Sequence, residues 1–164
     1  MKRQLIVIVF LLVYAAIFMA LQGCGAPYCH EEPHFTTRQD IAVCTEVALA
    51  EEFNPAFVSD LVNLIWQTPK YNGLKPNSIY FAQDLFSYKG EPAMGLYRGG
   101  MISIANMYPC TYHVLAHEFG HLYLDLKTGD ADPRHTDEIF VARPGEIVYD
   151  TALRLIEYCH QQGD

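Results

Sequence analysis

The sequence has few basic residues and does not gather them into clusters. Its 11 Lys and Arg stand against 19 Asp and Glu, which gives a formal charge of −8. Because an acidic balance repels phosphate, it excludes a typical nucleic-acid-binding protein. Charged residues make up only 18% of the chain and apolar residues 51%, which excludes a disordered chain. Repeats and low-complexity runs are also absent, and 164 residues suit a single folded domain.

The N-terminus has the pattern of an export signal. Two basic residues precede a run from Leu5 to Leu21 that contains no charged residue. Leu21-Gln22-Gly23-Cys24 follows and resembles the bacterial lipobox, whose cysteine becomes the lipidated first residue. We therefore expect residues 1–23 to be a lipoprotein signal peptide and lipid on Cys24 to anchor the chain in a bacterial membrane, outside the cytoplasm. An uncleaved membrane anchor and a plain signal peptide are the alternatives.

The remaining cysteines point to disulfide bonds. The chain has no CxxC pair, which disfavours a cysteine-based zinc site. An even number of cysteines in an exported chain predicts two disulfides, with three pairings open; buried free thiols are the alternative. These four residues are Cys29, Cys44, Cys110 and Cys159.

The rest of the chain predicts a small α+β domain over residues 37–164, joined to Cys24 by a tether over residues 24–36. Apolar spacing and turn residues predict helices and short strands in alternation. The helices are expected over Asp40–Trp66 (broken at Asn54-Pro55), Pro109–Lys127 (capped by Gly129) and Ile147–Tyr158. The strands are expected over Ile79–Phe81, Leu96–Arg98 and Met101–Ile104, the last two joined by a Gly99-Gly100 turn. We expect a compact domain with helices packed on a small, mainly antiparallel sheet.

The central helix carries an HExxH motif, His117-Glu118-Phe119-Gly120-His121. Two histidines four residues apart project from one helical face, so both imidazoles can reach one Zn²⁺, and Glu118 stands beside them. An apolar stripe on the opposite side is expected to face the core. Its members are Leu115, Phe119, Leu122 and Leu126.

A catalytic zinc site usually needs a third protein ligand, and His135 is the first candidate. The helix beyond His121 carries the chain about 9 Å away, and residues 128–135 can span up to about 27 Å, so His135 can return to the site. Other candidates for this ligand are Glu146, Glu157, Asp130, Asp132, Asp137 and Glu138. His113 can compete but is assigned to packing. Asp125, four residues after His121, is interpreted either as a carboxylate that orients an imidazole or as a solvated surface acid.

The stretch from His117 to His135 resembles the zincin superfamily of zinc metallopeptidases. The HExxH motif followed by GDxDxxH (residues 129–135) is similar to a group of small bacterial lipoproteins regarded as metallopeptidases. Metzincins have Gly and His where this chain has Leu124 and Lys127, and the NExxSD segment typical of thermolysin-like enzymes is absent.

The resemblance implies hydrolysis of peptide bonds in a peptide or protein substrate. Zn²⁺ on His117, His121 and His135 would activate a water molecule, and Glu118 would act as its general base. By the same analogy Met101–Ala105 would be the strand that faces the substrate. Tyr149 or Tyr108 would stabilise the oxyanion.

Two other classes of protein remain as alternatives. One is a non-catalytic zinc-binding envelope lipoprotein, either a degenerate peptidase or a metal carrier. The other is a structural envelope lipoprotein whose histidines bind no metal. Glu118 discriminates against the first, because such a protein does not need a carboxylate between its ligands. Stoichiometric zinc binding that is lost in His117→Ala would exclude the second.

Overall fold

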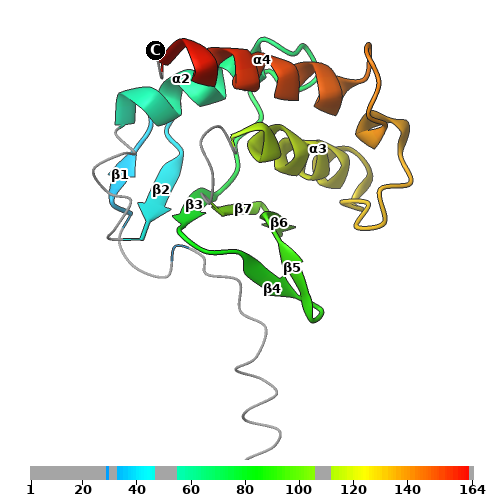
Figure 1. Cartoon of the computed structure of the whole chain (residues 1–164), viewed down its shortest axis with the longest axis horizontal. Coiled ribbons are helices and arrows are strands. Elements are labelled where there is room, and N and C mark those ends of the chain that lie inside the picture. The colour runs from blue at the N-terminus through cyan, green and yellow to red at the C-terminus, as the bar shows by residue number, and fades with distance from the viewer. Residues whose placement is uncertain (1–28, 30–32, 47–54, 106–111, 163–164) are drawn as a thin grey trace, which may run out of the picture.

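The computed structural model describes residues 29, 33–46, 55–105 and 112–162 (Figure 1). The predicted signal peptide and Cys24 lie outside these ranges. Within them, no helix combines the length and apolar character that crossing a bilayer requires.

A five-stranded mixed sheet forms one layer of the domain. In spatial order its strands are β1 (Phe35–Thr36), β2 (Ala42–Thr45), β3 (Ser78–Ala82), β7 (Met101–Ala105) and β6 (Gly95–Arg98). The three inner strands are parallel to one another, and β1 and β6 are antiparallel to their neighbours. β4 (Phe86–Tyr88) and β5 (Glu91–Ala93) form a separate antiparallel pair.

The helices of the described residues lie on one side of this sheet (Figure 1). They are α2 (Pro55–Trp66), α3 (His113–Thr128) and α4 (Ile147–Gln162), with a short 3₁₀ helix η2 (Glu138–Phe140) between the last two. α3 contacts β6 and β7 on one side and α4 on the other. The predicted α+β class is therefore confirmed, and α3 is the central helix.

The core lies between the sheet and the helices. Strands and helices contribute aliphatic and aromatic side chains to it, and these side chains exclude water. Its fully buried members include Ile79, Phe81, Ile102, Ile104, Leu61, Ile65, Leu115, Phe119 and Leu155. Because α3 is held between two layers, one face of it is fixed in the core.

The prediction of a helix from Asp40 was wrong for its first residues. Ala42–Thr45 forms strand β2, paired with β1 on one side and parallel to β3 on the other. Three apolar positions at helical spacing in so short a segment do not separate a helix from a strand. The β-branched Val43 and Thr45 favour the strand once neighbouring chains satisfy its backbone. Residues 47–54 lie outside the described residues, and α2 begins at Pro55 as predicted.

The other elements follow the prediction more closely. β6 and β7 meet at Gly99 and Gly100, which have φ of 54° and 83°. These positive values are the ones that a tight hairpin requires. Gly129 ends α3 with φ 77°, and α4 extends beyond the predicted Tyr158. Strands β1, β2, β4 and β5 and the helix η2 were not predicted.

One member of the predicted apolar stripe on α3 does not reach the core. Leu126 is 64% exposed, whereas Leu115, Phe119 and Leu122 are at most 1% exposed. Leu126 lies in the last turn of the helix, beyond the core residues of the stripe.

Both cysteines of one disulfide lie within the described residues. Cys29 is bonded to Cys44 of β2, with 15 residues of sequence separation. This bond ties the segment before β1 to the sheet, and Phe35 and Thr36, at the end of the expected tether, already form β1. Cys159 is also disulfide-bonded. Cys110 lies outside the described residues.

Candidate metal centre

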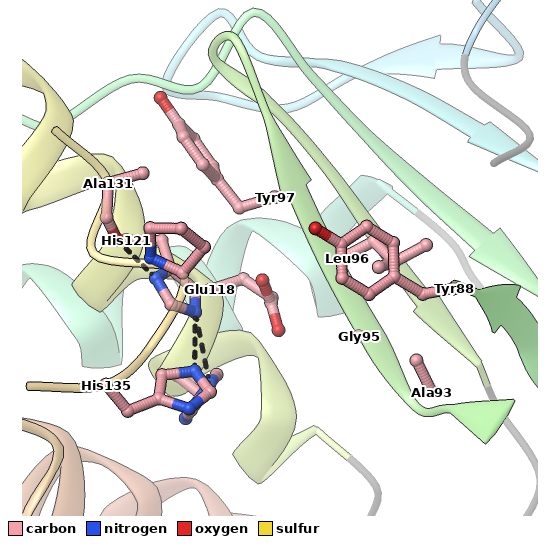
Figure 2. Close-up of a pocket in the computed structure, with 11 residues that line it drawn as sticks. Tyr88, Ala93, Gly95, Leu96, Tyr97, Glu118, His121, Ala131 and His135 are labelled. Atoms are coloured by element: carbon pink, nitrogen blue, oxygen red, sulfur yellow. Dashed lines mark hydrogen bonds between the residues drawn. The ribbon is translucent and has the colours of Figure 1, made fainter. Parts of the chain in front are cut away.

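Three imidazoles converge in the cleft beside α3. The Nε2 atoms of His117, His121 and His135 lie 3.0, 3.1 and 3.2 Å from one another. In a tetrahedral site with metal–nitrogen distances of 2.0–2.1 Å, ligating nitrogens are about 3.3 Å apart. Within the described part of the chain, these three residues are the group of donors placed to hold a metal ion. His135 therefore joins the other two as predicted (Figure 2).

Hydrogen bonding alone does not satisfy this cluster. Each Nε2 carries either a proton or a lone pair. Among three atoms in mutual contact at least two have the same character, so at least one contact opposes two protons or two lone pairs. A cation removes this conflict because it takes all three lone pairs. The donor set therefore fits a metal of the kind that neutral imidazole binds.

Neighbouring groups keep the nitrogens available. The Nδ1 of His121 lies 2.6 Å from the carbonyl oxygen of Ala131. A carbonyl only accepts hydrogen bonds, so this Nδ1 carries the proton and the Nε2 carries the lone pair. Burial and the neighbouring histidines lower the pKa of His117 to about 4, and burial lowers the pKa of His121. Both imidazoles are neutral at pH 7.

A network of hydrogen bonds within the loop after α3 holds the segment that contains His135. One carboxylate oxygen of Asp132 accepts from the hydroxyl of Thr136 and the other from the backbone N–H of Asp137. Asp137 in turn caps η2 by accepting from the N–H of Ile139. His135 itself adopts φ 54°, an uncommon conformation for a residue other than glycine. The loop is thus folded around its own acidic side chains, and the histidine projects from it.

The alternative third ligands have other roles or places. Asp130 accepts from the N–H of Asp132, and Glu146 binds Arg143. Asp132 and Asp137 are engaged in the loop, while Glu138 and Glu157 are exposed on η2 and α4. His113 lies one turn before His117 and is outside the group of three.

Glu118 is buried between α3 and β6. It is 3% exposed, and its desolvation raises the pKa of the carboxyl to about 8. Its side chain points toward strand β6 at the position of Gly95 (Figure 2). A Cβ at Gly95 would lie 2.3 Å from Oε1 of Glu118 and 2.5 Å from Cγ1 of Val114. Gly95 is therefore required by the close approach of a carboxyl group and not by its backbone conformation.

We expect Gly95→Ala to destabilise the protein by about 1–3 kcal/mol, the usual cost of overpacking. Alanine is otherwise the better residue in a strand, so any loss reports the steric conflict. Chemical denaturation of the metal-free protein measures it. In a background with Glu118→Ala and Val114→Ala the same substitution should cost much less, because the colliding atoms are gone. An equal cost in both backgrounds would contradict the assignment.

The three histidines and Glu118 line one cavity of about 210 Å³. Its other walls come from β4 to β6 and from the loop after α3, and they are mostly apolar or aromatic. They are formed by Tyr88, Ala93, Gly95, Leu96, Tyr97, Ala131 and Pro133. Three of these four polar side chains, His117, Glu118 and His121, come from helix α3, and His135 comes from the loop that follows it.

Asp125 has a different partner from the one predicted. Its carboxylate accepts a 2.5 Å hydrogen bond from the hydroxyl of Tyr97, while the carbonyl of Ala131 holds the Nδ1 of His121. The ring of Tyr97 stacks on His121 with centroids 6.3 Å apart. Asp125 therefore contacts Tyr97, and the ring of Tyr97 in turn lies against His121. Asp125 near the end of α3 can reach Tyr97 of β6 because this helix and this strand are in contact.

One of the two tyrosines predicted to stabilise the oxyanion can be placed in the structure. Tyr149 lies on α4 and does not line the cavity, and Tyr108 lies outside the described residues. Tyr97 and Tyr88 line it instead. Burial and the hydrogen bond to Asp125 raise the pKa of Tyr97 to about 12, and its hydroxyl also accepts from the N–H of Gly100. Because this hydroxyl is held away from the histidines, Tyr97 supports a wall of the cleft.

Met101–Ala105 is not the edge strand of the sheet. It forms β7, which lies between β3 and β6, so the strand beside the cleft is β6. Gly95, Tyr97 and Ala131 were also missed as site residues. A glycine within a strand signals close approach of other groups, which is the one sequence signal that pointed to Gly95.

Comparisons with protein-family models, with curated proteins and with solved structures found no match.

Proposed function

We propose that this chain is a zinc metallopeptidase of the zincin type. The observation that carries the proposal is the convergence of three Nε2 atoms within 3.2 Å in a cleft that also contains the buried Glu118. Three imidazoles leave one tetrahedral position open, the arrangement typical of catalytic zinc sites. A carboxyl group beside such a position serves proton transfer, for which a metal carrier has no use.

The chain supplies the ligands and the base. His117, His121 and His135 would hold the ion. Bound zinc would provide the Lewis acid that activates water and polarises a peptide carbonyl. Glu118 would accept the proton of the attacking water and deliver it to the nitrogen of the departing amine. Its position in the same cleft as the three histidines suits a group that exchanges protons with a water molecule held there.

The substrate would lie along strand β6. β6 forms an edge of the five-stranded sheet, and Gly95, Leu96 and Tyr97 of this strand line the cleft. An extended peptide can pair with the free backbone groups of such an edge. This arrangement would bring the scissile bond over the space between Glu118 and the histidines.

We further propose that the chain is a lipoprotein of the bacterial cell envelope, anchored through Cys24. The lipobox and the preceding apolar run support this location, and the disulfide between Cys29 and Cys44 is typical of an oxidising compartment. The domain would then act on peptides or proteins outside the cytoplasm.

A peptidase assay tests the proposed activity. Residues 25–164, refolded without a His tag and loaded with one equivalent of Zn²⁺, should cleave an unstructured protein such as casein. New amino termini measure the cleavage, and removal of the metal with a chelator should abolish it. Tight zinc binding without cleavage would favour the non-catalytic zinc-binding lipoprotein instead. Absence of zinc binding would contradict both.

A further inference from the structure

A single aromatic ring contacts all three histidines. The ring centroid of Phe140 lies 4.9 Å from that of His117, 4.6 Å from His121 and 4.8 Å from His135. The imidazole centroids are 4.7 to 5.0 Å from one another. The four rings therefore occupy the corners of an almost regular tetrahedron. Phe140 does not line the cleft, whereas the three histidines do, so it lies on the side of the imidazoles that faces away from the cleft.

The surrounding residues make room for this ring and hold it. Gly120 stands between the two helical histidines, and a Cβ there would lie 2.9 Å from Cε1 of Phe140. Phe140 ends η2, the 3₁₀ helix that Asp137 caps and that directly follows the loop carrying His135. The same hydrogen-bonded segment therefore contains both His135 and the aromatic ring that packs against the three histidines.

We propose that Phe140 is a positioning residue of the metal site, because the three imidazoles pack against its ring. Packing against one rigid ring restricts the rotation of each imidazole, so less conformational freedom is lost when a metal binds. The ring also excludes water from the back of the site, which strengthens the metal–ligand interaction and leaves the cleft as the open side. The inference rests on the metal site of the proposed function and does not depend on peptide hydrolysis.

Replacement of the ring tests the inference through metal affinity. Phe140→Ala should weaken Zn²⁺ binding by about 10–100-fold, the usual cost of removing a group that supports metal ligands. Phe140→Leu, which keeps an apolar side chain at this position, should retain most of the affinity. Titration of metal-free protein against a chromophoric chelator measures both, with circular dichroism to confirm that each variant is folded. Bound Co²⁺ should show an altered visible spectrum in Phe140→Ala, because the imidazoles are no longer held in one arrangement.

Ile139→Ala is the matched control. Ile139 is the neighbouring residue of η2 and is 6% exposed, and it belongs to an apolar cluster with Leu124 and Val148. Its truncation should lower the stability of the fold while leaving Zn²⁺ affinity within about threefold of the wild type. Phe140→Ala with wild-type affinity would overturn the inference. So would an equal loss in Ile139→Ala, since the ring would then act only by holding the loop together. Wild-type protein that binds no Zn²⁺ would overturn the proposed function itself.

Discussion

His135→Ala should lower the affinity for Zn²⁺ by roughly 10²–10³-fold while the protein stays folded. Binding energies of about 10 kcal/mol or more are typical of protein zinc sites. Shared among three imidazoles, this is roughly 3 kcal/mol for each, or about two factors of ten. His135 is exposed on a loop, so its truncation removes a ligand without opening a cavity in the core. His117→Ala and His121→Ala should lose as much affinity.

Competition with a chromophoric chelator measures this affinity directly, and thermal unfolding measures it independently. A ligand that binds only the folded state stabilises it, by about 4 kcal/mol at 1,000 times its dissociation constant. The wild type should therefore melt several degrees higher with Zn²⁺, and His135→Ala should not. His160→Ala is the matched control, because this histidine is exposed at the far end of α4. Unchanged affinity in His135→Ala would show that another residue is the third ligand.

The helical part of this site could be predicted because its determinants are local. The spacing of His117 and His121 places them on one face of any helix, and the apolar stripe of Leu115, Phe119 and Leu122 fixes which face is buried. Gly129 ends the helix for a reason internal to its own turn. His135 could be predicted as a candidate from chain length alone. The hydrogen bonds of Asp132 that fold the loop around this histidine are not revealed by the sequence.

The sheet could be predicted only in part because its pairings are distant in sequence. The Gly99-Gly100 turn shows that β6 and β7 pair, but not which of them lies against β3. The residue composition of the two strands distinguishes the inner strand from the edge strand. Strand β7 is almost continuously apolar and buried, as an inner strand must be, whereas β6 contains Gly95 and the exposed Arg98. The misassignment of Ala42–Thr45 as helix has the same origin, since its partners β1 and β3 are what make it a strand.

Contacts that form only in the folded site were beyond the reach of the sequence. Tyr97 reaches Asp125 because a strand and a helix 28 residues apart lie side by side. Ala131 acts through its backbone carbonyl, so its residue type carries no signal. In the sequence Phe140 cannot be distinguished from other core aromatic residues. Only the fold of the loop places its ring against the three imidazoles.

Glu118→Gln should reduce the rate of peptide hydrolysis by about 10²–10⁴-fold, the contribution typical of a general base. Its Zn²⁺ affinity should stay within about threefold of the wild type. Glutamine has nearly the shape of the protonated acid, and burial raises the pKa of Glu118 to about 8. The metal-free protein at neutral pH therefore already contains mostly the neutral form. The substitution should leave the packing against Gly95 intact and remove only the ability to accept a proton.

Zinc content and steady-state kinetics on the same preparation separate the roles of the two kinds of residue. Loss of a base lowers kcat and leaves KM nearly unchanged, whereas loss of a ligand lowers the zinc content itself. Glu138→Gln, the same change at an exposed carboxylate on η2, should keep both within about twofold. Retained activity in Glu118→Gln would exclude this carboxyl as the proton acceptor. The residual rate of a zinc-loaded Glu118→Gln protein would then measure what the metal site and the cleft accomplish without a base. Only the difference from the wild type is the contribution of Glu118.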